Sequence, residues 1–166
     1  MARRTFLALA PVALLSACGF RLRGAPEFAF ESLFLNAPAG SSLARELQRT
    51  LEASGGRLKV LREPATLPTA QVVFDLLAER QERVVVGLTA SGQVRELQLR
   101  LRVRIRLRGA DGNEWIPDTE LLQNRDISYS ETIALAKEAE EALLFRNMQT
   151  DIVQQIVRRL AAVRLK

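Results

Sequence analysis

The sequence contains no histidine and only one cysteine among its 166 residues. Histidine is the commonest general base and the commonest metal ligand, so its absence removes the usual routes to acid–base catalysis and to a metal centre. A single cysteine also cannot form an intramolecular disulfide. The chain has no Gly-x-Ser-x-Gly motif and no cluster of metal ligands. These absences argue against an enzyme, and they predict that the protein carries no cofactor and no metal.

The one cysteine, Cys18, ends a segment that has the features of a lipoprotein signal peptide. Arg3 and Arg4 provide a positive start, and residues 6–15 are apolar but too few to span a membrane. The segment Leu15-Ser16-Ala17-Cys18 then resembles a bacterial lipobox, in which the thiol is linked to diacylglycerol before cleavage. The alternative, a buried cysteine in an apolar helix, leaves the coincidence of these features unexplained. We therefore predict lipidation at Cys18.

Three segments follow from this prediction: a signal peptide over residues 1–17, a lipidated start and tether over residues 18–31, and one domain over residues 32–166. Cleavage removes two of the 24 basic side chains, so the net charge of +5 falls to +3. Export also makes nucleic acid the wrong partner for this basic chain. Acyl chains hold a protein on a membrane, and Gly19 stands where aspartate would resemble an inner-membrane retention signal. The expected location is the periplasmic side of the outer membrane.

The mature chain is organised around residues 95–108, where apolar and polar side chains alternate strictly. This period of two predicts a strand with one buried face and one wet face, about 45 Å long. The wet face carries an arginine at every second position, and we call this set the arginine ladder: Arg100, Arg102, Arg104, Arg106 and Arg108. Such closely spaced like charges would repel one another. We expect acidic partners for them from Asp75, Glu79 or Glu120, or from another chain.

Other patterns predict the remaining elements. Leu43, Leu47 and Leu51 recur at helical spacing after a capping serine, Ser41 or Ser42, and before Gly55-Gly56. A second, longer helix of some 25 residues begins near Ala136, with Thr132 or Ser130 as its start signal and an apolar stripe running from Ala142 and Leu143 to Leu160. Strands are expected over residues 32–36, 71–86 and about 115–129, with only a weak strand signal over residues 57–61. Turns at residues 87–92 and 109–113 join the last three strands as hairpins, with irregular pairing near residues 79–83 and at Pro117.

The element order β-α-β-β-β-α predicts an α+β fold, in which two helices pack on one face of a mostly antiparallel four-stranded sheet. Both helices must cover the leucine side of the central strand, because that is the apolar face. The arginine ladder is then expected on the uncovered face.

Three separated segments of the chain have the pattern of one known family. The mature start reads Cys18-Gly19-Phe20-Arg21-Leu22-Arg23, and a turn and strand read Ser91-Gly92-Gln93-Val94-Arg95-Glu96-Leu97. The start of the last helix reads Ala134-Leu135-Ala136-Lys137, followed by an acidic cluster. Together these segments resemble the LptE family of lipopolysaccharide-assembly lipoproteins. The element order matches as well, so the resemblance covers essentially the whole mature chain.

This resemblance implies a protein that plugs the large outer-membrane β-barrel LptD, helps it to assemble, and binds lipopolysaccharide. Two basic family positions are tied to lipopolysaccharide binding. One of them corresponds to Lys137, whose alternative is an ordinary surface lysine at a helix end. The other lies in a hairpin turn and corresponds here to Ala90, so that only Arg95 is left as a substitute. The alternative function is an auxiliary anchored lipoprotein of another envelope transport complex.

The arginine ladder has two interpretations at this stage. It can be a solvated face, in which long cationic side chains cover the sheet and deter aggregation. It can also be a contact surface for lipid A phosphates, or for the polar lumen of a barrel, with Arg100, Arg102, Arg104 and Arg106 as the contacting residues.

Overall fold

The computed structural model describes residues 26–54, 56–129 and 134–164. Within these residues the chain forms five strands, two α-helices and one 3₁₀ helix. In chain order they are β1 (Ser32–Asn36), α2 (Ser42–Ala53), β2 (Lys59–Leu61), η1 (Pro64–Thr69), β3 (Val72–Leu88), β4 (Val94–Gly109), β5 (Glu114–Ser128) and α3 (Ala134–Ala162).

The strands form one mixed sheet in the order β2-β1-β3-β4-β5. The short strands β1 and β2 are parallel to each other, and β1 is parallel to β3, whereas β3, β4 and β5 pair antiparallel. The predicted α+β class is therefore confirmed, but the sheet has five strands instead of four. The additional strand is β2, which the sequence signals only weakly because it is three residues long and lies at an edge.

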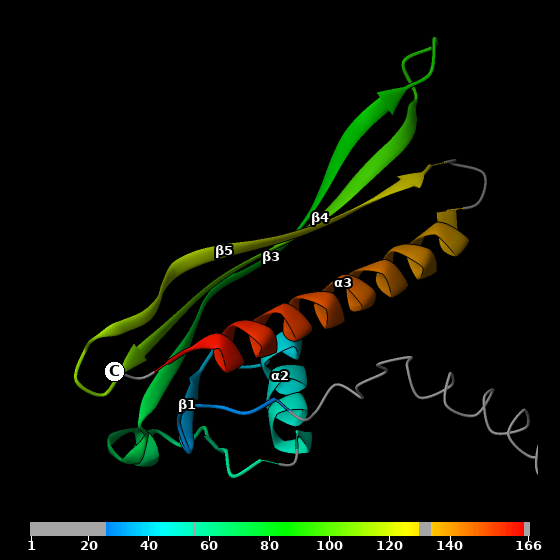
Figure 1. Ribbon diagram of the computed structural model, residues 1–166. Coiled ribbons are helices and arrows are strands. Elements are labelled where there is room, and N and C mark those ends of the chain that lie inside the picture. Colours follow the sequence, from blue (N-terminus) through cyan, green and yellow to red (C-terminus); the bar gives the residue numbers. More distant parts are fainter. Residues whose placement is uncertain (1–25, 55, 130–133, 165–166) are drawn as a thin grey trace, which may run out of the picture.

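One face of this sheet is covered by both α-helices (Figure 1). The odd-numbered apolar residues of β4, from Leu97 to Leu107, are buried in the same core as the apolar stripes of α2 and α3. Met148, Ile152 and Ile156 of α3 are fully buried there. The alternation over residues 95–108 thus separates a core face from an arginine face, as predicted.

The core stripe of α3 begins later than predicted. Ala142 and Leu143 are exposed, and Phe145 is the first buried apolar residue of the described part of α3. The first turns of α3 run past the end of α2, so no second helix covers these positions (Figure 1). The predicted start signals of this helix, Ser130 and Thr132, lie outside the described residues.

Strand β3 changes face at a register shift. Leu76 pairs with Ile105, but Ala78 pairs with Arg104, so Leu77 is an extra residue between them. Because side chains alternate along a strand, one extra residue exchanges the faces of everything that follows. Before the shift, the even-numbered residues Val72, Phe74 and Leu76 point to the helix side, where the core lies. Beyond the shift the odd-numbered residues do so, and Glu79 therefore points to the helix side.

The hairpin of β3 and β4 extends beyond the rest of the sheet and past the start of α3 (Figure 1). Its turn places Gly92 at φ +81°, and the next turn places Gly112 at φ +85°, where glycine is the least strained residue. Both turns lie where the sequence predicts them. Pro117 lies on the edge strand β5 next to a register shift, as expected for a residue that cannot donate to a ladder.

Candidate functional site

The arginine ladder lies on the sheet face opposite the two α-helices. Near β1, Ala70 at the end of η1 packs on this face against Phe34 and Val73, and the three residues form a small second cluster. Over β4 itself neither α2 nor α3 lies on the ladder, and the ladder's side chains are half-buried or exposed. The face is therefore available to a partner along most of the strand.

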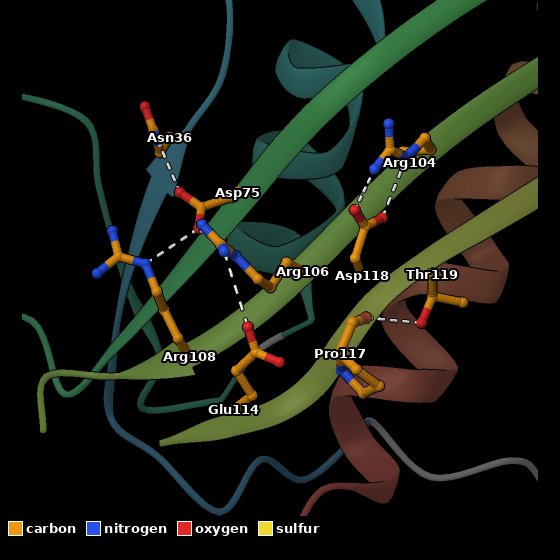
Figure 2. Close-up of polar contacts among 9 residues, drawn as sticks. All are labelled: Asn36, Asp75, Arg104, Arg106, Arg108, Glu114, Pro117, Asp118 and Thr119. Carbon is orange, nitrogen blue, oxygen red and sulfur yellow. Dashed lines mark hydrogen bonds and ion pairs between the residues drawn. The ribbon is translucent and has the colours of Figure 1, made fainter. Parts of the chain in front are cut away.

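Asp75 binds Arg106 and Arg108, the two members of the ladder that lie nearest to β1 (Figure 2). This buried carboxylate accepts hydrogen bonds on Oδ2 from Arg106 Nη2 at 3.0 Å and from Arg108 Nε at 3.0 Å, and on Oδ1 from Asn36 Nδ2 at 2.7 Å. Burial alone would raise the pKa of Asp75, but the hydrogen bonds from Asn36, Arg108 and Arg106 outweigh it and hold the pKa below 3.8. The group thus stays ionised and joins β1, β3 and β4.

The middle of the ladder is paired with acids from both neighbouring strands. Arg102 donates to Glu82 of β3 at 3.2 Å and to Glu120 of β5 at 2.8 Å, and these bonds raise its pKa. Arg104 forms a two-bonded ion pair with Asp118, which raises its pKa too (Figure 2). Each arginine therefore has a carboxylate beside it that keeps the guanidinium group in a fixed position.

Arg100 differs from the other four members of the ladder. Its Nε donates to the neutral Gln98 at 2.6 Å, and no carboxylate lies within ion-pair distance among the described residues. Arg80 of β3 likewise faces Arg102 directly across the strand pair and has no such partner in the described part of the chain. A pocket of about 240 Å³ lies beside Arg80 and Arg102. It is lined by Ala78, Arg80, Arg102, Arg104 and Glu120.

The predicted acidic partners are confirmed for Asp75 and Glu120 and wrong for Glu79. Glu79 lies on the helix side, where it accepts a hydrogen bond from Ser41 at 2.8 Å, because the extra residue Leu77 has exchanged the faces. Sequence reasoning missed Glu82 and Asp118. Their pairing depends on the register, which the sequence pattern of a single strand does not contain.

Lys137 and Arg95 lie at the other end of the sheet, near the last residues of β5. Lys137 Nζ donates to Glu140 at 2.8 Å and to Ser128 Oγ at 3.4 Å, and its side chain is only 13% exposed. The carbonyl of Arg95 accepts from the backbone N–H of Tyr129 at 2.8 Å. A register shift leaves Arg95 as the extra residue of β4 between Val94 and Glu96, and its side chain lies 3.6 Å from that of Glu96. Lys137 and Arg95 therefore lie at the opposite end of the sheet from Asp75, Arg106 and Arg108.

Other expected features fall outside these two groups. Cys18 lies outside the described residues. None of the described helices combines the length and the apolar character that crossing a membrane requires. No group of three or more acidic, cysteine or histidine residues in the described ranges is arranged to hold a metal ion. Trp115 is half-buried and packs against the core.

The architecture defines a class of protein: an α+β domain with two helices on one face of a mixed sheet and a long, protruding hairpin. The structure is similar to lipoprotein B from Nitrosomonas europaea, with 34% identity, 87% of this chain and 91% of that chain covered, and a TM-score of 0.72. It shares its fold with a minor lipoprotein from Acinetobacter baumannii, at 24% identity with 82% and 94% covered and a TM-score of 0.64. Rare lipoprotein B from Shewanella oneidensis has the same fold, at 21% identity with 79% and 94% covered and a TM-score of 0.66.

A model of the lipopolysaccharide-assembly family LptE matches residues 27–160. The chain belongs to this family, as the resemblance of its segments indicates. A search of curated proteins finds no match. The protein is thus a lipopolysaccharide-assembly lipoprotein.

Proposed function

We propose that this protein is the lipoprotein subunit of the outer-membrane lipopolysaccharide translocon. In this role it plugs the LptD β-barrel, assists its assembly, and binds lipopolysaccharide as it passes to the outer leaflet. The observation that carries the proposal is the match to the lipopolysaccharide-assembly family over residues 27–160. Lipidation at Cys18 would anchor the domain on the periplasmic side of the outer membrane.

The arginine ladder is proposed as the surface that meets the barrel. Its inner four members are held by carboxylates of the same chain, so the face offers fixed polar groups with little excess charge. Such a face suits the polar interior of a β-barrel better than it suits a dense array of phosphates. Arg100 and Arg80, which have no carboxylate partner within the described residues, remain available for acidic groups of the partner.

Lys137 and Arg95 are proposed as the lipopolysaccharide contacts. They lie at the end of the sheet farthest from Asp75. One protein can therefore bind a barrel through the arginine ladder and an anionic lipid through this end of the sheet. Lys137 is held by Glu140 and Ser128, and a bound phosphate would replace or share these contacts.

Co-purification of the full chain in mild detergent tests the barrel partner. We expect a stoichiometric outer-membrane β-barrel to be recovered, and we expect the double variant Arg102→Gln with Arg104→Gln to recover several-fold less of it. The double variant Arg45→Gln with Arg49→Gln removes equal charge from α2 and serves as the control. Thermal unfolding of each variant separates loss of fold from loss of contact. Recovery of an inner-membrane transporter, or of no partner, would contradict the proposed function. If the ladder variant recovered as much barrel as the wild type, the arginine ladder would be a solvated face and not a contact surface.

Binding of purified lipopolysaccharide to the full chain tests the second contact. Replacing Lys137 with glutamine is expected to weaken binding about tenfold, because one charge-assisted contact of about 1.4 kcal/mol is lost. Lys59→Gln, on the exposed edge strand β2, is the matched control and should bind as the wild type does. If a fluorescent displacement titration gave equal affinities for both variants, Lys137 would not be a lipopolysaccharide contact.

A further inference from the structure

Strand β5 is the last strand on one side of the sheet, and most of its outer edge is regular (Figure 1). The opposite edge of the sheet is β2, which has only three residues. At its start β5 carries Pro117 and a register shift, two features that hinder the pairing of another strand. From Thr119 to Ser128, however, every residue of β5 pairs with β4 without a shift. We call residues 119–128 the regular edge, and such an edge is a template for a further strand.

The backbone of the regular edge offers hydrogen-bonding groups on its outer side. The N–H of Tyr129 donates to the carbonyl of Arg95 at 2.8 Å, so the odd-numbered residues of β5 turn their N–H and C=O groups toward β4. Because these groups alternate along an antiparallel pair, the even-numbered residues turn theirs away from β4. These outward residues, all with exposed side chains, are Glu120, Leu122, Asn124, Asp126 and Ser128. The Asn124 carbonyl accepts from Arg125 Nη1 at 2.8 Å, which leaves it one free lone pair.

The outward residues of the regular edge are acidic or neutral. Glu120 and Asp126 each use one carboxylate oxygen toward β4: Arg102 donates to Glu120 at 2.8 Å, and Gln98 donates to Asp126 at 2.9 Å. Arg102 is shared with a second acid, Glu82, and Gln98 is neutral, so neither carboxylate is fully neutralised. The second oxygen of each carboxylate has no hydrogen-bond partner within the described ranges, and it can accept from a donor beyond β5.

The cations of β4 lie one strand farther out of reach. Neighbouring strands are about 4.8 Å apart, so a strand added outside β5 would lie about twice as far from β4 as from β5. On β4, Arg104 is paired with Asp118, and Arg100 has no carboxylate partner in the described part of the chain. On the helix side the regular edge has one charge, Arg125, which is paired with Asp151 at 2.7 Å. The charges nearest to an added strand are therefore those of the two acids.

We propose that the regular edge binds an extended segment of a partner protein, which joins the five-stranded sheet beside β5 and carries basic side chains opposite Glu120 and Asp126. In this mode of recognition the main-chain hydrogen bonds supply affinity, and side chains at alternate positions supply specificity. Between the two acids lie Asn124 and Leu122, which is 45% exposed. An antiparallel segment therefore reads basic-x-polar-x-apolar-x-basic. This inference goes beyond the proposed function, because it concerns the backbone of β5 and not the arginine ladder.

A second copy of this chain does not have the charge that the edge requires. Two regular edges side by side would place one acidic row next to another, and none of the outward residues is basic. Like charges on neighbouring strands are destabilising. A segment with basic residues at the two outer positions removes this repulsion and fills the free lone pairs of Glu120 and Asp126.

Titration with two synthetic peptides tests the charge of the segment. The full chain in mild detergent is titrated with the fluorescent peptide Ser-Arg-Thr-Asn-Thr-Val-Thr-Arg-Ser, and with a matched peptide in which both arginines are replaced by glutamates. We expect the arginine peptide to bind about tenfold more tightly, because two opposite-charge pairs replace two like-charge pairs. Equal affinities, or binding of neither peptide, would overturn the inference.

A substitution at Asn124 tests the role of the backbone. The N–H of Asn124 points away from β4, so Asn124→Pro removes one outward donor and leaves the hydrogen bonds between β4 and β5 in place. Asn124→Ala removes the same side chain but keeps the N–H, and it is the matched control. We expect Asn124→Pro to weaken binding of the arginine peptide about tenfold and Asn124→Ala to leave it unchanged. Thermal unfolding checks the fold of both variants, and equal binding by the two would overturn the inference.

Amide hydrogen exchange of the wild-type chain gives the same test without a substitution. With the arginine peptide bound, the amides of Leu122, Asn124 and Asp126 should exchange about tenfold more slowly, whereas those of the odd-numbered residues of β5 should change little. Peptide binding without this slowing would mean that the peptide binds elsewhere, and it would overturn the inference. Slowing that grows with protein concentration in the absence of peptide would mean that a second copy occupies the edge, and it would overturn the inference as well.

The outcomes are separate from those of the proposed function. The peptide titration and the exchange measurement use no barrel, so their failure would leave the co-purification result unchanged. Absence of a co-purifying barrel would contradict the proposed function, and the arginine peptide would still be expected to bind the regular edge.

Discussion

Replacing Asp75 with asparagine is expected to lower the free energy of unfolding by about 3 kcal/mol, the lower end of the range for breaking a buried ion pair. The carboxylate is buried, and it accepts hydrogen bonds from Arg106, Arg108 and Asn36. Asparagine has a similar size but no charge, so two arginines would lose their common partner. Because both arginines keep about a third of their surface in water, the loss does not reach the upper end of the range. Urea unfolding followed by circular dichroism measures the difference.

The loss of stability in Asp75→Asn is expected to depend on pH. The pKa of Asp75 is below 3.8 in the folded protein, so the unfolded chain binds its proton first as the pH falls. The stability that Asp75 contributes is therefore complete above about pH 5, and it is lost as the pH falls through 3.8 toward the folded pKa. We expect the difference between wild type and Asp75→Asn to shrink in that window. Unfolding curves between pH 3 and pH 7 measure it.

A matched control comes from the middle of the ladder. Glu120 is exposed, and its ion pair with Arg102 lies on the solvent side of the sheet. Glu120→Gln should cost no more than about 1 kcal/mol, because exposed ion pairs contribute little. A loss for Asp75→Asn that equals the control's, or that does not change between pH 3 and pH 7, would contradict the assigned role of Asp75.

Local patterns were sufficient to predict most elements of this fold. The strict alternation over residues 95–108 assigns a face to each side chain of β4, and the helical spacing of Leu43, Leu47 and Leu51 places α2 on the apolar face. Since both helices have only one apolar sheet face to cover, the two-layer arrangement follows. The three-residue strand β2 is too short to give a pattern of its own, and it forms only because β1 offers an edge.

The site was less predictable because it depends on pairing between strands. A single extra residue, Leu77, decides that Glu79 points to the helices, and no local signal identifies which residue of β3 is the extra one. The register places Glu82 opposite Arg100 and Glu120 opposite Arg104, so both acids lie diagonally from Arg102, and their ion pairs with Arg102 also depend on the side-chain conformations. Residues 84–94, at the end of the β3–β4 hairpin, are visible in the sequence as an uncharged run, but the exposure of Val85, Val86 and Leu88 follows only from the length by which the hairpin exceeds the helices (Figure 1).

Replacing Cys18 with serine is expected to abolish lipidation completely. The thiol is the nucleophile that forms the thioether bond, and a hydroxyl cannot take its place in that reaction. Cleavage between Ala17 and Cys18 follows lipidation, so the variant should keep residues 1–17. Mass spectrometry of the N-terminal peptide measures both effects: the wild type should give an acylated peptide beginning at Cys18, and the variant an unmodified, uncleaved one. An unacylated wild-type peptide would contradict the lipobox assignment.

Gly19→Asp separates lipidation from sorting. The substitution leaves Cys18 and the lipobox intact, so the acylated peptide should form as in the wild type. Aspartate after the lipidated cysteine resembles an inner-membrane retention signal, and we therefore expect the variant to move from the outer-membrane fraction to the inner-membrane fraction on a density gradient. The anchor would then hold the domain on the wrong membrane, since acyl chains contribute about 0.8 kcal/mol for each buried CH₂. Recovery of the barrel should fall with this relocation although the folded domain is unchanged. If Gly19→Asp stayed in the outer membrane with its barrel, sorting would depend on the partner and not on the residue after the cysteine.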